Sequence, residues 1–209
     1  MKLTDTCRLV PSRYPSVGIL DRVAAPEDLP FIFELESWTN DRISNELGIL
    51  HRMPREEWVT GRPMASVIMA AFCHPRPGGG RFNGPDRGAW YAATDLESAH
   101  AEVLYHRGKE LREVGVTEMR WQMRTYLADF DAEFEDIRDR PELHDPDSYQ
   151  TSQAYARDLM TAGAAGVFYR CVRRQGGECV ACFRPRLVLN VRAGAHFEYN
   201  TSGEVRKAS

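Results

Sequence analysis

Apolar and polar positions alternate irregularly in the first part of the chain and more regularly in the rest. In the first part, the run FIFELESW at 31–38 follows Pro26 and Pro30 and has apolar positions at helical spacing. No cluster of catalytic side chains is visible elsewhere in this part. The pattern predicts a helical N-terminal extension, residues 1–61, packed on a core formed by residues 62–209.

The centre of the chain has the pattern of a hairpin. The runs RFN at 81–83 and AWYA at 89–92 are typical of short strands, and the segment GPDRG between them has a turn-forming composition. In the antiparallel register that this hairpin favours, Arg81 lies opposite Tyr91. Directly opposed side chains project from the same face with Cβ atoms about 5 Å apart, so we expect a guanidinium and a phenol on one surface.

A helix is predicted directly after this hairpin. The run TDLE at 94–97 has the form of a capping box, and Leu96, Ala99 and Val103 follow at helical spacing. Glu102 lies at the edge of this apolar stripe. A carboxylate in that position can keep its charge and still reach a buried ligand.

The next segment is acidic and is followed by another helix. Residues 129–147 are rich in Asp and Glu and contain Pro141 and Pro146, which predicts a solvated loop or short irregular segments. The helix is expected to begin with Ser152 as its N-cap and to stop at Gly163.

The C-terminal part has the pattern of a second hairpin and a further strand. Strands are predicted at 167–172 and 179–183, joined through a Gly-Gly pair, and a third strand is predicted at 187–191. A tight turn at the glycines would place Cys171 opposite Cys182 across the hairpin.

Length and composition agree with one folded domain. Of the 209 residues, 43% are hydrophobic and 27% are charged, as in ordinary globular proteins. The net charge is −3 and the basic residues are scattered, so direct nucleic-acid binding is not expected. The longest apolar stretch is too short to span a bilayer and no leader pattern is visible, so we expect a cytoplasmic protein. Five cysteines, an odd number, favour reduced thiols over a disulfide framework.

Several of these segments together resemble the RES-domain family, which is named for its Arg, Glu and Ser residues. The resemblance covers roughly residues 13–183. It is carried by GGRFN at 79–83, WYAA at 90–93, AHAEVLYH at 99–106, HDPDSY at 144–149 and GVFYRCVR at 166–173.

The resemblance implies an α+β fold, with an ADP-ribosyltransferase-like mixed β core flanked by helices and an NAD⁺ cleft. It also implies the toxin of a bacterial type II toxin-antitoxin pair, with an Xre-like antitoxin that covers the active site. Family members break NAD⁺ down by attack of water or phosphate, or transfer ADP-ribose to a protein. Both reactions start at the nicotinamide-ribose bond, with NAD⁺ as substrate and no metal.

The residue types needed for this chemistry are present. Loss of nicotinamide leaves an oxocarbenium-like ribose, which a nearby carboxylate such as Glu102 stabilises. Arg81 can hold phosphate oxygens with two parallel hydrogen bonds. Tyr91 can stack on a planar ring and direct its hydroxyl toward the substrate or Glu102. We expect these three residues to be catalytic, with Arg81 and Tyr91 also binding NAD⁺.

Two further NAD⁺-binding residues are suggested by the resemblance. Arg22, in the run GILDRV at 18–23, resembles the family's N-terminal Arg and is a candidate second phosphate contact. Cys171 stands where the family has Ser. If this position orients ribose or phosphate, the weaker hydrogen bond of a thiol loosens the contact.

Other classes of protein share parts of this pattern. His100 and Glu102 together with Cys179 and Cys182 are similar to the zinc-site elements of nucleoside deaminases, although Glu178 stands where those enzymes have Pro. The CxxC pair is expected in a strand, where side chains three positions apart face opposite ways. A binding protein that has lost catalysis is another alternative. A Rossmann fold is rejected, because the glycine run lacks the third glycine and the βαβ unit.

Overall fold

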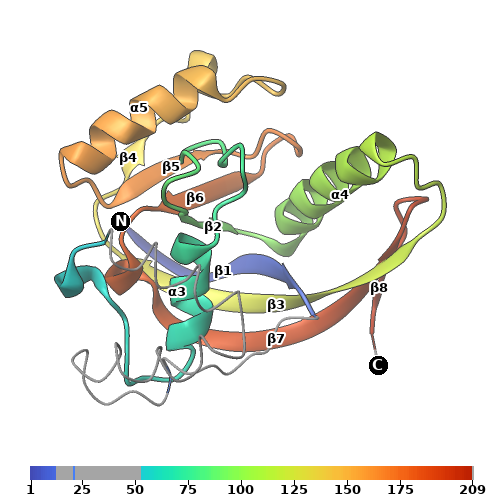
Figure 1. Cartoon of the computed structure of the whole chain (residues 1–209), viewed down its shortest axis with the longest axis horizontal. Coiled ribbons are helices and arrows are strands. Elements are labelled where there is room, and N and C mark those ends of the chain that lie inside the picture. Colours follow the sequence, from blue (N-terminus) through green and yellow to red (C-terminus); the bar gives the residue numbers. More distant parts are fainter. Residues whose placement is uncertain (13–20, 22–52, 209) are drawn as a thin grey trace.

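The structure, a computed structural model, describes residues 1–12, 21 and 53–208, which form one sheet with helices on both faces (Figure 1). The predicted helix at 31–38 and Arg22 lie outside these residues. The strands are β1 (Lys2–Pro11), β2 (Trp90–Ala93), β3 (Arg120–Asp131), β4 (Glu135–Asp136), β5 (Gly166–Arg170), β6 (Glu178–Cys182), β7 (Leu189–Asn200) and β8 (Val205–Lys207). The α-helices described are α3 (Ala65–Cys73), α4 (Leu96–Glu113) and α5 (Gln150–Thr161). Short 3-10 helices are η3 (Arg55–Glu57), η4 (Pro141–Leu143) and η5 (Pro185–Leu187).

Among the described residues, the sheet has eight strands in the order β4-β5-β6-β2-β1-β3-β7-β8. Neighbouring strands are antiparallel except for β4 and β5, which are parallel. The sheet is therefore mixed, and helices cover it on two sides. This arrangement confirms the mixed β core flanked by helices.

The N-terminal strand lies inside this sheet. β1 pairs with β2 on one side and with β3 on the other, and the Thr6 hydroxyl is buried and donates to the Ala128 carbonyl at 2.7 Å. A shift of register between Leu3 and Thr6 accompanies the left-handed backbone of Asp5, whose φ is 57°. The helical character predicted for the N-terminal extension is therefore not confirmed, because its first residues are a strand of the sheet.

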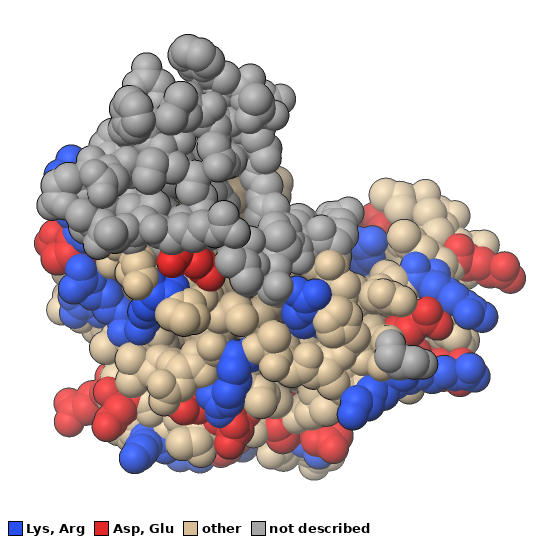
Figure 2. All heavy atoms as spheres, turned by 90° about the horizontal axis from the view of Figure 1, so that it is seen from below, with Lys and Arg blue, Asp and Glu red and all other residues tan. Residues whose placement is uncertain are grey.

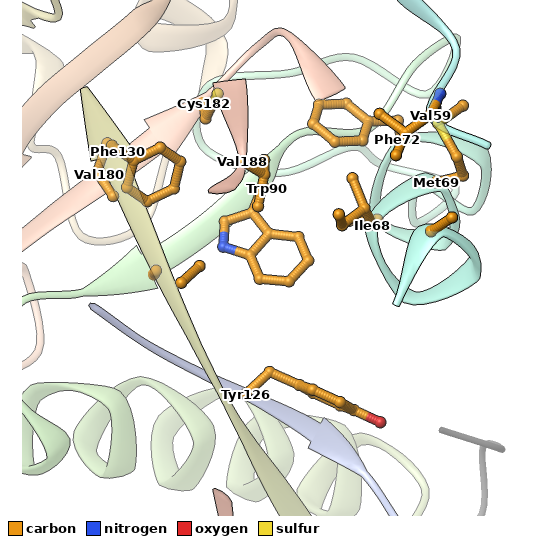
Figure 3. Close-up of a cluster of buried hydrophobic side chains, with 14 of the residues drawn as sticks. Val59, Ile68, Met69, Phe72, Trp90, Tyr126, Phe130, Val180, Cys182 and Val188 are labelled. Atoms are coloured by element: carbon orange, nitrogen blue, oxygen red, sulfur yellow. Dashed lines mark hydrogen bonds between the residues drawn. The ribbon is translucent and has the colours of Figure 1, made fainter. Parts of the chain in front are cut away.

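One face of the sheet carries the larger apolar cluster, which packs against α3. The side chains meet around Trp90 at the centre (Figure 3). From α3 come Ile68, Met69 and Phe72, and from the sheet come Trp90, Tyr126, Phe130, Val180 and Cys182. Asp21 accepts hydrogen bonds from the first amide groups of this helix, Met64 N–H at 2.8 Å and Ser66 N–H at 2.7 Å.

The opposite face packs against α4 and α5. Alternate residues of the same strands point here, because successive side chains of a strand face opposite ways. The buried members include Cys7, Ala93, Ala99, Ala156, Val167, Tyr169, Cys179 and Ala181. Cys179 and Cys182 therefore lie on opposite faces of the sheet, as the strand pattern predicted.

The two predicted helices are confirmed, but the residues predicted as their N-caps are wrong. α4 is capped by Asp95, which accepts a hydrogen bond from Ser98 N–H at 2.8 Å, so the helix begins one residue later than the capping box at Thr94 predicts. Ser152 lies buried within α5 and donates to the Tyr149 carbonyl at 3.1 Å. Gly163, with φ 77°, follows the end of α5 as expected.

The second hairpin forms with a different register from the one predicted. β5 and β6 pair with Gly166 opposite Cys182 and Tyr169 opposite Cys179, and residues 171–177 connect them. The expected pairing of Cys171 with Cys182 is wrong, because the connection is a longer loop and not a two-residue turn. Cys171 N–H donates to the Gly177 carbonyl at 2.8 Å, close to the end of the hairpin.

The acidic segment is irregular, as predicted, but it is only partly solvated. β3 continues to Asp131, and the following residues form the short β4 and η4. Phe134, Ile137 and Leu143 are buried in the two apolar clusters. These spaced apolar residues fix an acid-rich segment to the core.

Charged side chains of both signs are mixed on the surface. On the face in Figure 2, Lys and Arg lie among Asp and Glu. Several arginines are paired, such as Arg138 with Asp136 at 2.6 Å and Glu178 at 2.5 Å. Within the described parts of the chain, no helix is long and apolar enough to cross a membrane.

The loop before β2 supplies a test of the packing. A Cβ added to Gly88 would lie 2.1 Å from the Ala71 carbonyl oxygen, whereas one added to Gly84 would meet nothing within 4 Å. Overpacking of this kind typically lowers stability by about 1–3 kcal/mol, so we expect Gly88→Ala to lower the free energy of unfolding by that amount. Urea denaturation measures the change.

Gly84→Ala is the matched control in the same loop. It should leave stability unchanged or raise it by up to roughly 1 kcal/mol, because alanine reduces the entropy of the unfolded chain. Equal stabilities for the two variants would contradict the close approach of α3 to this loop.

Candidate active site

A cavity of about 300 Å³ opens on the α4 side of the sheet. It lies between α4, the C-terminal end of α3, the strands β1 and β2, and the glycine-rich loop that precedes β2. It therefore also reaches the α3 side of the sheet, where Arg8 packs on Trp90. All three predicted catalytic residues, Arg81, Tyr91 and Glu102, line it. Other lining residues include Cys7, Arg8, His106, Tyr149, Tyr169 and Cys179.

The Tyr91 hydroxyl holds the loop in place. It accepts a hydrogen bond from Phe82 N–H at 2.8 Å and donates to Asn83 Oδ1 at 2.7 Å. Burial raises the pKa of this phenol well above its ordinary value, so the hydroxyl stays protonated and remains able to donate. The hydroxyl therefore points to the loop and not to Glu102, which was one of the two directions predicted for it. The Tyr91 ring lines the cavity.

The predicted hairpin of 81–83 with 89–92 is wrong. Its first segment forms only an isolated bridge between Gly80 and Asn83, and β2 pairs instead with β1 and β6. The Tyr91 side chain, and not a backbone ladder, connects the two segments. Arg81 and Tyr91 nevertheless reach the same cavity.

Glycines allow the loop to approach its neighbours. Gly79 has a φ of 73°, and a Cβ on Gly80 would lie 2.7 Å from the Tyr91 hydroxyl oxygen. From α5, Gln153 Nε2 donates to the carbonyl groups of Gly78 and Gly80, each at 2.9 Å. Helix α5 thus fixes the backbone of the loop that carries Arg81.

Arg81 is buried, with only 7% of its surface exposed. One guanidinium nitrogen donates to the Asp145 carbonyl at 2.5 Å, and the guanidinium carbon lies 4.6 Å from the centre of the Tyr149 ring. A buried cation held by a carbonyl and a ring, without an acidic partner in these contacts, is suited to bind an anion.

Glu102 lies on α4 and is half-buried. Its Oε2 is 3.4 Å from His106 Nε2, one helical turn later, and its Oε1 accepts a hydrogen bond from the Cys171 thiol at 3.5 Å. The predicted NAD⁺ contact Cys171 therefore lies next to the predicted catalytic carboxylate, although it is not among the residues that line the cavity.

Cys171 also has a thiol neighbour, Cys179 on β6. A hydrogen bond from Cys179 lowers the pKa of Cys171, and the same pair interaction together with burial raises the pKa of Cys179. Both side chains are buried, at 6% and 2% exposure. The thiol pair thus lies close to the Glu102 carboxylate, and of the two thiols only that of Cys179 belongs to a residue that lines the cavity.

Arg8 is a cavity residue that the sequence did not single out. Its guanidinium donates to the Tyr91 carbonyl at 3.1 Å and lies 5.0 Å from the centre of the Trp90 ring. Burial lowers its pKa to about 10, so it remains a cation at neutral pH. The only sequence signal for Arg8 was that it is a charged residue within an otherwise apolar run, CRLV at 7–10. No neighbouring motif indicated that it belongs to a site.

Two aromatic residues of the cavity, Tyr149 and Tyr169, were not predicted as site residues from the sequence. Tyr169 on β5 is buried with its ring edge against Phe82, at a centroid distance of 4.8 Å. Burial raises the pKa of Tyr169 well above its ordinary value. Together with Tyr149 and Tyr91, it gives the cavity aromatic walls.

A second hollow of about 470 Å³ adjoins the cavity. The two share Arg76, His106 and Tyr149, and the second extends between α4 and residues 146–153. Lys109 adds a further cation to its lining. These three shared residues therefore form a common boundary of the two hollows.

The ligand set of the deaminase alternative is not brought together. Cys182 faces the α3 side of the sheet, opposite to Cys179, and its thiol contacts the Arg184 carbonyl at 3.3 Å. His100 Nδ1 lies 2.6 Å from the Tyr199 hydroxyl. A His/Cys/Cys site built from these residues is therefore excluded by the geometry.

Removal of the Tyr91 hydroxyl tests its role in holding the loop. Tyr91→Phe leaves Phe82 N–H without its partner, and a buried unpaired group of this kind typically costs about 1–3 kcal/mol. We expect the free energy of unfolding to fall by that amount in chemical denaturation. Tyr155→Phe, which loses only contacts of its hydroxyl to the exposed residues Glu135 and Arg140, should change it by less than about 0.5 kcal/mol. A stable Tyr91→Phe protein would contradict this role.

One comparison with known proteins, the match to a family model, agrees with the sequence resemblance. A family model described as the RES domain matches residues 49–202, more than half of the chain. The uncharacterized protein y4oC of Sinorhizobium fredii is 25% identical over 199 residues, which are 94% of this chain and 82% of that protein. The crystal structure of the M. tuberculosis MbcT-MbcA toxin-antitoxin complex is similar at 17% identity, covering 61% of this chain and 75% of the solved one, with a TM-score of 0.44. On the family match, this chain belongs to the RES-domain family.

Proposed function

We propose that this protein cleaves the nicotinamide-ribose bond of NAD⁺ and transfers ADP-ribose to water or phosphate. We further propose that it is the toxin of a bacterial toxin-antitoxin pair. The observation that carries the proposal is the joint presence, in one cavity, of the Glu102 carboxylate, the buried Arg81 guanidinium and a set of aromatic rings. Membership of the RES-domain family supports the same reaction.

The reaction breaks the bond between the ribose carbon and the nicotinamide nitrogen. The bonding electrons leave with nicotinamide, which becomes neutral, and positive charge develops on the ribose as in glycoside cleavage. Water or phosphate then adds to the carbon and loses a proton. The protein accelerates this step if it stabilises the developing charge more than it stabilises the substrate.

Glu102 supplies that stabilisation in the proposal. Its carboxylate is held by His106 on the same helix and by the Cys171 thiol, so its orientation is set before the substrate binds. A preorganised charge in a partly water-excluded cavity interacts more strongly than the same charge in water. Nicotinamide carries the positive charge in the ground state, and the ribose receives it in the transition state.

Arg81 and Arg8 are the proposed partners of the pyrophosphate. Arginine has five N–H donors, and the Asp145 carbonyl engages one nitrogen of Arg81. The remaining donors are available to the proposed phosphate contacts. Arg8 adds a second cation from β1, a role that the sequence had suggested for Arg22.

The aromatic walls and the size of the cavity favour a stacked ring. Planar rings such as nicotinamide bind well against aromatic side chains, here Tyr91, Tyr149 and Tyr169. At about 300 Å³, the cavity is at the lower end of the range of small-molecule sites. In the proposal it holds the nicotinamide riboside, and the adenosine half extends into the adjoining hollow.

The proposed partner is an antitoxin of the Xre-like type that covers this cavity in the cytoplasm. Covering would exclude NAD⁺ from Glu102 without any change in the fold. The proposal requires no metal ion for the chemistry, because the charge stabilisation comes from side chains.

Purified protein should release nicotinamide from NAD⁺, and Glu102→Gln should release it more slowly. Loss of one preorganised charge typically lowers the rate by about 10²–10³-fold. Chromatography of the nicotinamide released over time measures the effect. Glu97→Gln, an exposed change on the same helix, should keep the wild-type rate.

The products identify the acceptor. If water is the acceptor, the mass of ADP-ribose is expected. If phosphate is the acceptor, the mass of ADP-ribose 1″-phosphate is expected when phosphate is added to the reaction. Mass increases on proteins would indicate transfer to a side chain instead. Wild-type protein that binds NAD⁺ without releasing nicotinamide would refute the proposed reaction.

Expression in a bacterium without the antitoxin should arrest growth. The reason is loss of cellular NAD⁺, so NAD⁺ measured in extracts should fall before growth stops. Glu102→Gln expressed to the same level should allow growth. Arrest by this variant, with NAD⁺ unchanged, would show that toxicity does not come from the proposed chemistry.

A further inference from the structure

Three potential metal ligands converge beneath the cavity. The Glu102 carboxylate and the thiols of Cys171 and Cys179 offer ligand atoms that all lie within 4.8 Å of one another. They come from three separate elements: α4, the loop after β5, and β6. Nothing in the proposed NAD⁺ cleavage requires the second thiol.

The spacing agrees with tetrahedral coordination of zinc. Bond lengths of about 2.3 Å to sulfur and 2.0–2.2 Å to oxygen place tetrahedral ligands about 3.5 Å apart for sulfur and oxygen, and about 3.8 Å apart for two sulfurs. The Cys171 sulfur lies 3.5 Å from Glu102 Oε1. This distance and the 4.8 Å limit on the others place the three ligand atoms close to the separations that one shared ion requires.

A disulfide accounts less well for the same pair of thiols. Cys171 lies opposite Gly177 and Cys179 lies opposite Tyr169, so the two cysteines are diagonal neighbours in the hairpin. Diagonal Cβ atoms are up to roughly 7 Å apart, whereas a disulfide needs about 3.5–4.5 Å. An ion shared by the two sulfur atoms, with bonds of about 2.3 Å to each, does not need the Cβ atoms to come as close as a disulfide does.

The cluster can be reached from the cavity. Glu102 and Cys179 both line it, and Glu102 is half-buried at its wall. An ion bound to the three side chains would have its fourth position directed to the cavity, where water or a ligand can complete the tetrahedron. Soft thiolates and one carboxylate select zinc or cadmium over magnesium or calcium.

We propose that Glu102, Cys171 and Cys179 form an inhibitory site for a thiophilic divalent cation such as Zn²⁺. Binding exchanges one proton from each thiol for the ion, so the site releases protons as it fills. The ion also takes up the Glu102 carboxylate. If the proposed function holds, on which this consequence rests, zinc lowers NAD⁺ cleavage by removing the carboxylate from the ribose.

Cadmium binding to the full chain, kept reduced with a phosphine, tests the site without any need for activity. We expect one ion per chain and an ultraviolet thiolate-to-cadmium charge-transfer band, with Zn²⁺ competing for the same site. Removal of an outer-shell partner of a metal typically lowers the metal affinity by roughly 10–100-fold. Cys179→Ser and Cys171→Ser each remove a direct ligand, so each should weaken cadmium binding by more than that. The second variant serves if the first fails to fold.

Cys182→Ser is the matched control, because it removes a buried thiol from the same strand but from the opposite face. It should bind cadmium as the wild type does. Absence of a charge-transfer band in folded wild-type protein, or a band unaffected by both cysteine variants, would overturn the site. A cadmium band together with NAD⁺ cleavage that zinc does not inhibit would overturn the inhibitory role alone. A protein that binds cadmium but does not cleave NAD⁺ would refute only the proposed function.

Discussion

The alternation of side chains along β2 and β6 determines where the cavity can form. Trp90 and Val180 point toward α3 and fill the larger apolar cluster, whereas Tyr91 and Cys179, one position away on each strand, point toward α4. Because the side-chain period is two, a slip of one residue would exchange the two sets and place bulky core residues in the cavity. The packing of α3 therefore fixes the register on which the opposite face depends.

The parts of the fold that could be predicted are those with strong local signals. Apolar spacing identified α4 and α5, and β-type runs identified β5 and β6. The predicted site residues Arg81, Tyr91 and Glu102 do converge on one cavity, although from a loop, a strand and a helix that pack in a way no local pattern displays. Their roles in catalysis stay a prediction.

The rest depends on contacts between distant segments. β1 carries polar residues such as Thr6 and Arg8 in the middle of the sheet, so its sequence does not have the apolar pattern of a central strand, and its partners lie far along the chain. The hairpin expected at 81–83 failed because the Tyr91 hydroxyl satisfies the loop backbone in place of a ladder. Cys171 lies next to Cys179, and not opposite Cys182, because the β5–β6 connection is longer than the two-residue turn predicted from the glycine pair.

The position of β1 has a consequence for how the protein is made. The cavity combines Arg8, near the start of the chain, with Tyr169 and Cys179, near its end, and β1 is held in the sheet by β3. Long-range pairing of this kind forms late, since the intervening chain must first be closed into loops. A nascent chain still lacking β5 and β6 on the ribosome has no complete cavity, so in the proposed toxin harmful activity would begin only once synthesis is nearly finished.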